Sequence, residues 1–325
     1  MKIKKNHIYA GVIVLLILIA AIFYLKPFTP MKKPQEKKEE ISWLVDKNGY
    51  LFYPADRGDI KFRRENYGME GNLSIHKIIY QSRNGNIYGL LVLPTTAKEL
   101  LPGVVLLPGA GVGKESELGL AKKIALLDAA VLVIDQRGVG ETDGSFPTLD
   151  DDYASFLQSK EPVQHLMVYD ALRAFDLLYS APFVDPDRIM IAGESLGGRI
   201  GILAAAIDRN IKGALVISSA GFDFKGGPDA NKNAFLESID PDHYIGLITP
   251  RKLVMVHNHN DRNVPLSNAV RTYQKAQQPK QFVLVNDTAC NHGYCDSMHD
   301  GLVAALDYLV GVKARNLVSV PDKQK

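Results

Sequence analysis

Three residues of this 325-residue chain have the types and the order that nucleophilic acyl transfer requires. Ser195 stands in Gly193-Glu-Ser-Leu-Gly197, Asp261 follows later in the chain, and His292 comes last. A serine hydroxyl is a poor nucleophile unless an adjacent base takes its proton, and histidine suits this task because its ordinary pKa lies near neutrality. A buried carboxylate must then orient the imidazole and stabilise its protonated form. The sequence therefore offers a nucleophile, an acid and a base.

The serine lies at a predicted corner between a strand and a helix. Four apolar residues, Ile189 to Ala192, precede the motif, and apolar residues at helical spacing follow it from Ile200 to Ile207. Such a corner is called a nucleophile elbow, and it needs glycines beside the serine because the neighbouring backbones approach closely. The five-residue motif alone is a weak signal, since it also arises by chance. Its meaning depends on partners elsewhere in the chain.

The acid has rivals in the sequence. Asp261 follows a predicted apolar strand and precedes the histidine, which is the order that this kind of elbow requires. Asp135 lies on an earlier strand, and Asp287 stands too close to the histidine turn. A plain turn role is the other interpretation of Asp261, because Asn263 and Pro265 follow it. We predict Asp261 as the acid and keep the other two as alternatives.

The base could be either of two histidines near the end of the chain. His299 falls within the last helical run, whereas His292 sits in the turn before it, so we predict His292. Cys290 and Cys295 bracket this histidine. Outside the cytoplasm a disulfide could close the short loop and stiffen it, and two free thiols are the alternative. A zinc site built on both cysteines would consume the base, so we discount it.

A second pattern overlaps the acid. The stretch from His257 through His259 to Asp261 has the H-x-H-x-D spacing of metallo-β-lactamase-like hydrolases. The next residue is Arg262 where a histidine would complete the pattern, and the stretch comes late in the chain. We therefore predict no metal and interpret His259 as a polar neighbour of the acid turn. Acyl transfer to serine also needs no cofactor.

The surrounding sequence alternates between apolar runs and helical patterns. A hairpin is predicted from 74–80 to 86–93, because Asn84-Gly85 is the strongest short hairpin signal. Apolar strands are predicted at 104–107, 130–134, 189–192, 214–217, 253–256 and 282–285, and helices at 118–127, 163–179 and 200–207. Continuous apolar strands separated by helices describe a mostly parallel sheet that is covered on both faces.

Two stretches interrupt this alternation. Residues 144–162 and 221–250 are longer than common connections and contain turn residues with short helical pieces. Ligands bind at the carboxyl ends of such strands, so we predict that these stretches form a small lid, with plain surface loops as the alternative.

We predict four parts along the chain. They are a membrane anchor at 1–25, a tether and extension at 26–72, the folded domain at 73–312 and a flexible tail at 313–325.

Several motifs occur in a recognisable order along the chain. They are the segments 103–111 (GVVLLPGAG), 131–140 (VLVIDQRGVG), the elbow, 257–265 (HNHNDRNVP) and 291–293 (NHG). With these motifs, the chain from Leu73 to Val310 resembles the α/β-hydrolase superfamily, and more narrowly its dienelactone-hydrolase-like and prolyl-oligopeptidase-like serine hydrolases. The resemblance implies an α/β-hydrolase fold in which Ser195, Asp261 and His292 form the catalytic triad.

The resemblance also implies an oxyanion site. In this fold one backbone N–H comes from the residue after the nucleophile, here Leu196, and the other from the turn after an earlier strand. That turn is Gly109-Ala110-Gly111, where we predict Ala110 as the donor and Gly111 as the alternative. Many relatives carry His-Gly at this turn, whereas this chain has Pro108-Gly109, so any positioning role of that histidine is lost.

The N-terminus predicts a membrane anchor. Eighteen uncharged residues, Ile8 to Leu25, would form a helix of about 27 Å, close to the hydrocarbon thickness of a bilayer. Lys26-Pro27 follows directly, without the small residues of a signal-peptide cleavage site. More lysines follow the run than precede it, which by the positive-inside rule would keep the domain in the cytoplasm. First helices often act as signal anchors, however, and we expect an extracytoplasmic domain.

The bulk composition sets the remaining limits. With 46% hydrophobic and 23% charged residues and a net charge of +2, the chain has an ordinary globular composition and no feature that predicts nucleic-acid binding.

The function that these motifs predict is hydrolysis of a carboxylic ester or related small-molecule acyl compound through an acyl-serine intermediate. A serine peptidase of the prolyl-oligopeptidase type is the alternative, although residues 41–72 are too few for one propeller blade of roughly 40 residues. A membrane-displayed binding protein on an inactive hydrolase scaffold is the third hypothesis, and the complete triad argues against it.

Overall fold

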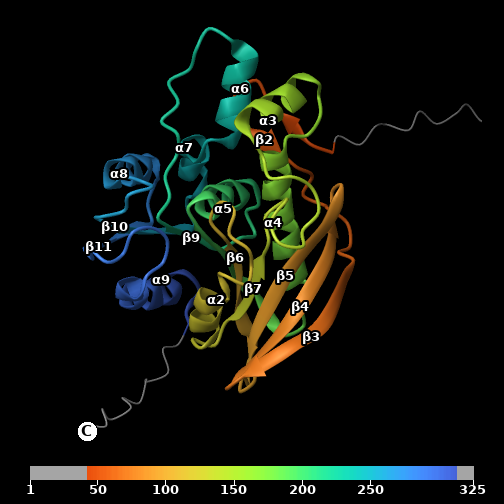
Figure 1. Cartoon of the computed structure of the whole chain (residues 1–325), viewed down its shortest axis with the longest axis vertical. Helices are drawn as coiled ribbons and strands as arrows, with labels where there is room; N and C mark the ends of the chain where they lie inside the picture. Colours follow the sequence, from red (N-terminus) through yellow and green to blue (C-terminus); the bar gives the residue numbers. More distant parts are fainter. Residues whose placement is uncertain (1–41, 313–325) are drawn as a thin grey trace, which may run out of the picture. The chain divides into compact units, whose positions relative to one another are not determined.

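The computed structural model describes residues 42–312 (Figure 1). Its strands are β1 (Leu44–Val45), β2 (Leu51–Phe52), β3 (Phe62–Glu70), β4 (Leu73–Ser82), β5 (Gly85–Pro94), β6 (Leu101–Leu107), β7 (Ala130–Ile134), β8 (Val184–Glu194), β9 (Gly213–Ile217), β10 (Lys252–Asn258) and β11 (Lys280–Val285). Its helices are α2 (Leu118–Ala125), α3 (Leu149–Leu157), α4 (Val163–Tyr179), α5 (Leu196–Ile207), α6 (Ala230–Ile239), α7 (Pro241–Tyr244), α8 (Leu266–Lys275) and α9 (His299–Val310). Two short 3-10 turns, η1 (Ile245–Ile248) and η2 (Asp296–Met298), complete the described part.

Nine strands form the central sheet in the order β11-β10-β9-β8-β6-β7-β5-β4-β3. The six strands from β11 to β7 run parallel to one another, and β5, β4 and β3 continue the sheet in antiparallel pairs. Strands β1 and β2 form a separate small antiparallel pair. The predicted mostly parallel sheet is confirmed.

Helices cover both faces of the sheet. One apolar core lies between the sheet and helices α4, α5 and α8, and the other lies between the sheet and helices α2 and α9. In Figure 1, α8 and α9 lie on opposite sides of β10 and β11. Every residue of β6 and β7 is buried, because these strands are covered on both sides. This burial explains why the central strands read as unbroken apolar runs in the sequence.

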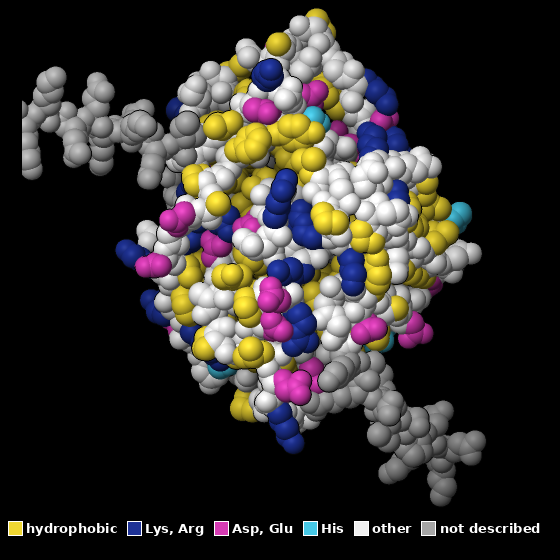
Figure 2. All heavy atoms as spheres, turned by 180° about the vertical axis from the view of Figure 1, so that it is seen from behind, with side chains coloured by type: hydrophobic (Ala, Val, Ile, Leu, Met, Phe, Trp, Pro, Cys, Tyr) yellow, Lys and Arg dark blue, Asp and Glu magenta, His cyan; other side chains and the backbone are white. Residues whose placement is uncertain are grey.

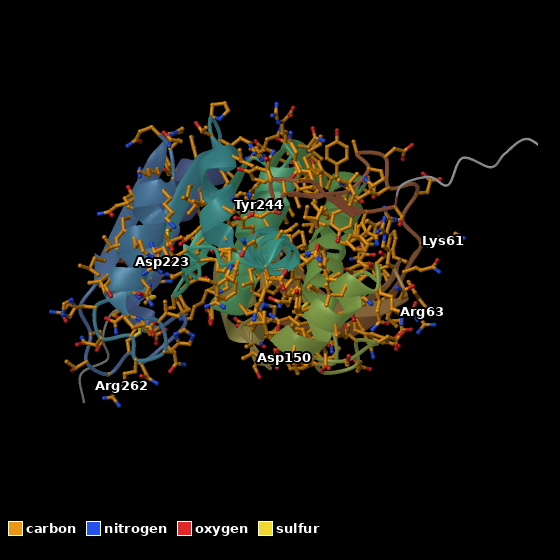
Figure 3. The ribbon with its side chains drawn as sticks, turned by 90° about the horizontal axis from the view of Figure 1, so that it is seen from above. Lys61, Arg63, Asp150, Asp223, Tyr244 and Arg262 are labelled. Carbon is orange, nitrogen blue, oxygen red and sulfur yellow. A yellow bond between two sulfur atoms is a disulfide. The ribbon has the colours of Figure 1, made fainter. Side chains whose placement is uncertain are left out.

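The sheet begins before the position at which we expected the folded domain to start. Strand β3 pairs with β4 from Phe62 opposite Tyr80 to Glu70 opposite Leu73, so part of the predicted extension belongs to the sheet. This strand has no apolar alternation, since nearly all its side chains are exposed at the sheet edge. Charged residues are common on edge strands, where they discourage pairing with other chains. Figure 3 shows Arg63 on this side of the molecule, away from Arg262.

The two stretches predicted as a lid pack against each other. Helix α3 lies in the first stretch, and α6, α7 and η1 lie in the second. The rings of Tyr153 and Phe156 on α3 both lie 5.6 Å from the ring of Phe235 on α6. Trp43, just before β1, lies 5.7 Å from the buried ring of His165 on α4. Figure 1 accordingly shows α3, α6 and β2 at one end of the molecule.

The membrane prediction falls outside the described residues. The predicted anchor at 1–25, the tether up to residue 41 and the tail at 313–325 are not part of the range that the structure describes. Within 42–312, none of the helices combines the length and the apolar composition needed to cross a bilayer.

Candidate active site

Ser195 lies at the corner between β8 and α5, as the motif predicts. Its backbone has φ 50° and ψ −114°, and such a conformation costs a non-glycine residue about 1–3 kcal/mol. A Cβ at Gly193 would overlap the carbonyl group of Gly197, and a Cβ at Gly197 would overlap the carbonyl group of Leu107. Only glycine permits these two backbone contacts. They hold the corner tight and leave the serine partly exposed.

The predicted acid and base are in direct contact. Nδ1 of His292 lies 2.9 Å from both carboxylate oxygens of Asp261, whose side chain is 0% exposed. Oδ1 of Asp261 also accepts the backbone N–H groups of Asn263 at 2.9 Å and Val264 at 2.8 Å. These amides fix the carboxylate, which accepts Nδ1–H and leaves Nε2 as the acceptor of the ring. The pair therefore has the geometry of an oriented general base.

Glu194 joins the elbow to the histidine turn. This residue directly precedes the serine, and its Oε1 accepts the backbone N–H of Tyr294 at 3.0 Å. A Cβ at Gly293 would lie only 2.6 Å from Oε2 of Glu194, so the carboxylate also packs against the residue next to His292. The neighbours of the nucleophile and of the base are thus in contact.

Two serines at the end of β9 add further links. Oγ of Ser218 donates to the carbonyl group of Gly293 at 3.3 Å. Oγ of Ser219 donates to the carbonyl group of Ser195 at 2.6 Å. The carboxyl ends of β8 and β9 therefore fasten both the nucleophile and the histidine turn.

The turn after β6 lies against the nucleophile. A Cβ at Gly109 would be 3.7 Å from the Cβ of Ser195, so the backbone of this turn borders the serine directly. Nε2 of Gln136 donates to the carbonyl group of Pro108 at 2.5 Å and holds the start of the turn. The site thus fixes this turn through a neighbouring side chain, although the chain lacks the His-Gly sequence of many relatives.

The predicted oxyanion donors occupy suitable places. Leu196 is the first residue of α5, so its N–H has no acceptor within the helix. Ala110 is exposed in the turn that borders the serine, and Gly111 beside it has a φ of +72°. Ala110 and Leu196 stay our predicted donors, with Gly111 as the alternative to Ala110.

The rival residues have other partners. Oδ2 of Asp135 lies 2.8 Å from Nζ of Lys114, and both side chains are buried. Asp287 accepts the backbone N–H two residues further on at 2.8 Å, and that bond lowers the pKa of its carboxyl group. Nδ1 of His299 lies 3.1 Å from the hydroxyl group of Tyr294. Asp135, Asp287 and His299 therefore each have a partner outside the predicted triad.

Two side chains of the H-x-H-x-D stretch lie near each other, with Nε2 of His257 3.9 Å from Oδ2 of Asp261. His257 is buried, its Nε2 donates to the carbonyl group of Val264 at 2.9 Å, and burial lowers its pKa. His259 is exposed just beyond the end of β10. Across residues 42–312, His, Cys, Asp and Glu side chains form no cluster of three or more that could hold a metal ion.

A disulfide closes the histidine turn. Cys290 and Cys295 are bonded, with their Cα atoms 5.9 Å apart, and His292 lies in the loop between them. Nδ2 of Asn258, at the end of β10, donates to the carbonyl groups of Cys290 and, at 2.8 Å, of Asp287. The turn that carries the base is therefore held by one covalent bond and by a side chain of the adjacent strand.

Sequence reasoning missed the residues that connect these turns. Glu194, Ser218, Ser219 and Gln136 had no assigned role, although each contacts the backbone of a predicted site segment. Their positions at the ends of predicted strands are a usable signal, because strand ends border the site in this fold.

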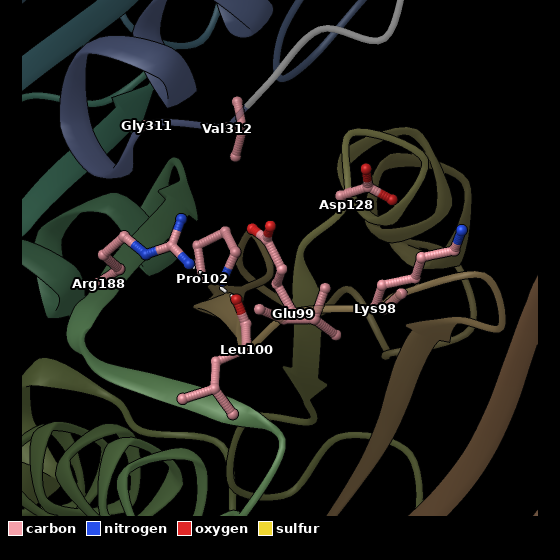
Figure 4. A pocket seen from close by; sticks show the side chains of 10 residues that line it. Lys98, Glu99, Leu100, Pro102, Asp128, Arg188, Gly311 and Val312 are labelled. Carbon is pink, nitrogen blue, oxygen red and sulfur yellow. Dashed lines mark hydrogen bonds between the residues drawn. The ribbon is translucent and has the colours of Figure 1, made fainter.

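A hollow of about 280 Å³ lies elsewhere in the molecule (Figure 4). Lys98, Glu99 and Arg188 line it together with Gly311 and Val312. These residues surround the amino end of β6, whereas the turn beside Ser195 follows its carboxyl end. Seven strand residues at about 3.3 Å each separate the two ends, so the hollow is not part of the site.

Comparison with known proteins gives the family. The family model of acetyl xylan esterase (AXE1) matches residues 56–226. The acetyl xylan esterase from Paenibacillus sp. R4 superposes with a TM-score of 0.65 at 20% identity, over 77% of this chain and 88% of that one. Acetyl Xylan Esterase 1 from Thermoanaerobacterium sp. JW/SL YS485 gives 0.60 at 15% identity, over 78% and 89%.

A curated relative matches in sequence over a shorter part. The uncharacterized protein YfhR of Escherichia coli (strain K12) is 26% identical over 176 residues, which are 48% of this chain and 60% of that protein. The two esterase structures share the predicted α/β-hydrolase fold, which is thereby confirmed. The family model covers more than half of the chain and includes the elbow with Ser195. The chain therefore belongs to the acetyl xylan esterase (AXE1) family, a family of esterases.

Proposed function

We propose that the protein is a serine esterase that removes acetyl or similarly small acyl groups from the hydroxyl groups of a carbohydrate. The contact between His292 and Asp261 carries this proposal, because it supplies an oriented base in a turn that contacts Glu194, the residue before the nucleophilic serine. The family to which the chain belongs supports an ester substrate, and the acetyl group and the sugar are inferences from that family.

The mechanism that we propose gives each of the predicted residues one role. Oγ of Ser195 attacks the ester carbonyl carbon while Nε2 of His292 takes its proton, and Asp261 stabilises the imidazolium that forms. The N–H groups of Leu196 and Ala110 bind the oxyanion of the tetrahedral intermediate. The imidazolium then protonates the leaving alcohol, and the acyl group stays on the serine. Water, activated by the same histidine, releases the acid and restores the hydroxyl group.

We also infer a lid over the acyl-binding side. Support comes from the packing of α3 on α6 and from exposed apolar side chains in the first stretch, Phe146 at 40%, Leu149 at 49% and Leu157 at 53%. Figure 2 shows apolar side chains gathered in the upper part of the face it presents, toward the end at which α3 and α6 lie in Figure 1. Such a surface suits contact with an apolar part of the substrate.

We infer an anchored, extracytoplasmic enzyme. The uncharged run at 8–25 supports the anchor, and the bond between Cys290 and Cys295 supports an oxidising compartment, because disulfides persist outside the cytoplasm. Fractionation of cells that express the full chain, with protease added to intact cells, tests both inferences. Recovery in the soluble cytoplasmic fraction would contradict them.

The experiment that tests the proposed function compares three classes of acyl compound. Full-length protein is assayed on acetylated xylo-oligosaccharides, on p-nitrophenyl esters of increasing chain length and on aminoacyl p-nitroanilides. We expect acetate release and a preference for the shortest esters, both abolished in Ser195→Ala. Turnover of the anilides alone would favour the peptidase hypothesis, and full activity of Ser195→Ala would refute the mechanism.

A further inference from the structure

A second hollow, of about 450 Å³, lies between the start of the described chain and the two stretches that were predicted as a lid. Its lining includes Trp43 just before β1, Phe156 on α3 and Asn231 on α6. Small-molecule sites commonly have volumes of roughly 300–1,000 Å³. The hollow therefore has room for a ligand, and the proposed mechanism uses none of the residues that line it.

The segments that border this hollow belong to the edge of the sheet that carries the nucleophile. Helix α3 follows β7 in the chain, and α6 follows β9. Strands β7, β8 and β9 run parallel in the sheet, and β8 ends directly before Ser195. Figure 1 shows α3 and α6 at one end of the molecule. Because ligands bind at the carboxyl ends of such strands, the hollow lies on the substrate side of the sheet.

Two aromatic rings in the hollow are held in place from behind. The ring of His165, whose side chain is buried, lies 5.7 Å from the ring of Trp43 and 6.5 Å from the ring of Phe156. The carbonyl group of Ser42 accepts an N–H of Arg83, which fixes the backbone beside the tryptophan. Trp43 and Phe156 are only half-buried, so each keeps part of its ring accessible.

The polar groups of the lining are not engaged with the rest of the described chain. Nε1 of Trp43, the hydroxyl group of Ser159 and the side-chain amide of Asn231 make no hydrogen bond to residues 42–312. The backbone N–H of Asn231 donates to Asp229 at 2.9 Å, which fixes this residue at the start of α6. The other lining side chains are aliphatic, and none of the lining side chains carries a charge.

This lining determines which ligand the hollow suits. It offers no charged partner to a carboxylate or a phosphate. A sugar ring presents C–H groups on its faces, which pack on the negative face of an aromatic ring, and hydroxyl groups on its edge. Those hydroxyl groups pair with an indole N–H, a hydroxyl or an amide. A purely apolar ligand would instead cover these polar groups and leave them unpaired, at a cost in free energy.

We propose that the hollow between β1, α3 and α6 binds a neutral oligosaccharide chain at a site separate from the catalytic residues. Trp43 and Phe156 stack on its sugar rings, and Ser159 and Asn231 bond to its hydroxyl groups. The inference rests on the proposed function, in which the esterified alcohol is a carbohydrate. A chain held there raises the local concentration of its ester groups at Ser195. The hollow thus lowers KM for long substrates and leaves the chemistry on small esters unchanged.

The first test measures binding without turnover. Trp43 is the only tryptophan in the chain, so the tryptophan fluorescence of the full-length protein reports on the hollow. The protein in phosphatidylcholine vesicles is titrated with unsubstituted xylohexaose, which contains no ester. We expect a saturable change in emission in the wild type and about tenfold weaker binding in Asn231→Ala, which loses the amide. Lys232→Ala is the matched control, because Lys232 is an exposed neighbour on α6 that does not line the hollow.

The Lys232→Ala variant should bind xylohexaose like the wild type. An unchanged emission in the wild type, or equal affinity in the wild type and Asn231→Ala, would overturn the proposal. Two further probes test the chemical class of the ligand. An acidic oligogalacturonate should bind more weakly than xylohexaose, and equal or tighter binding would contradict a neutral ligand. Vesicles of brominated phosphatidylcholine should quench Trp43 little, and strong quenching that xylohexaose does not relieve would assign the hollow to lipid instead.

The second test separates substrate binding from support of the fold. kcat and KM are measured for acetylated xylohexaose and for p-nitrophenyl acetate. Asn231→Ala should raise KM for the acetylated oligosaccharide by about tenfold at unchanged kcat, and should leave both constants for p-nitrophenyl acetate at the wild-type values. An equal loss on both substrates would show a structural role and overturn the proposal.

Failure of this proposal can be told apart from failure of the esterase proposal. The xylohexaose titration requires no catalytic activity, so it decides on the hollow even if no acetate is released. Full activity of Ser195→Ala would refute the esterase mechanism and leave the titration valid. A wild-type protein that releases acetate but does not bind xylohexaose through Asn231 would refute only the second sugar-binding site.

Discussion

His292 and Asp261, 31 residues apart in the chain, meet through Nδ1 and the carboxylate at 2.9 Å. The acid follows β10 and the histidine follows β11, and these two strands are parallel neighbours in the sheet. Their carboxyl ends therefore lie at the same edge, which brings residues from two separate loops into one hydrogen bond. The buried carboxylate of Asp261 also accepts two backbone N–H groups, and these bonds fix its orientation independently of the histidine.

The first prediction concerns this hydrogen bond. Asp261→Asn should fold, because the amide oxygen can still accept the N–H groups of Asn263 and Val264. Its NH2 group would face Nδ1 and favour the wrong tautomer of His292, so kcat should fall by about 10⁴-fold. Steady-state kinetics on p-nitrophenyl acetate measure this loss. Asp287→Asn is the control and should retain wild-type kcat, and an equal loss in both variants would contradict the assignment.

A second prediction concerns the glycines of the elbow. Gly197→Ala should prevent correct folding, since its Cβ would overlap the backbone of Leu107 and no side-chain movement relieves a backbone overlap. Gly119→Ala is the matched control in α2, because its Cβ would meet no atom within 4 Å. That change should stabilise the protein by about 0.5–1 kcal/mol. Thermal unfolding followed by circular dichroism checks both, and a native-like melt of Gly197→Ala would be the contrary result.

The disulfide gives a third prediction. Replacing both Cys290 and Cys295 by Ser should lower the free energy of unfolding by about 2 kcal/mol, because the bond closes a short loop. kcat should fall with little change in KM, since the loop carries His292. Wild-type protein treated with dithiothreitol should behave like the double variant, which itself should not respond to the reductant. Activity that is indifferent to both treatments would show that the bond does not position the base.

The buried ring of His165 gives a fourth prediction, on acid stability. Burial lowers its pKa from 6.5 to about 3 in the folded protein. As pH falls below about 6.5 the unfolded chain binds the proton first, so stability that is present above this pH is lost toward pH 3. The slope is about 1.4 kcal/mol per pH unit for one proton. Urea unfolding across this range should show a smaller slope in His165→Gln, and an unchanged slope in the exposed control His259→Gln.

Much of the fold could be predicted because most strands are buried on both faces. An unbroken apolar run such as β7 is visible in the sequence, and so is the hairpin at Asn84-Gly85 between β4 and β5. Strand β3 could not be predicted, because an exposed edge strand carries charged residues and has no alternation. The two-residue strands β1 and β2 are too short for any periodicity. The pattern of apolar residues thus predicts the buried central strands of the sheet better than its exposed edge strand β3.

The candidate site likewise contains residues that the sequence predicts and residues that it does not. Residue type and chain order predict Ser195, Asp261 and His292 because the chemistry restricts what each can be, and the structure brings the last two into contact. The contact of Glu194 with Tyr294 joins residues 100 positions apart and has no local signature. Ser218 and Ser219 act through backbone carbonyl groups, which any residue offers, so the sequence does not reveal their partners.

The most direct test of the central claim is the site of covalent labelling by a fluorophosphonate. Full-length protein is incubated with the probe, digested and mapped by mass spectrometry, with Ser195→Ala and His292→Ala treated in parallel. We predict one adduct per chain on Ser195, none on Ser195→Ala, and labelling of His292→Ala that is slower by several orders of magnitude. An adduct on another residue, or labelling of His292→Ala at the wild-type rate, would contradict it.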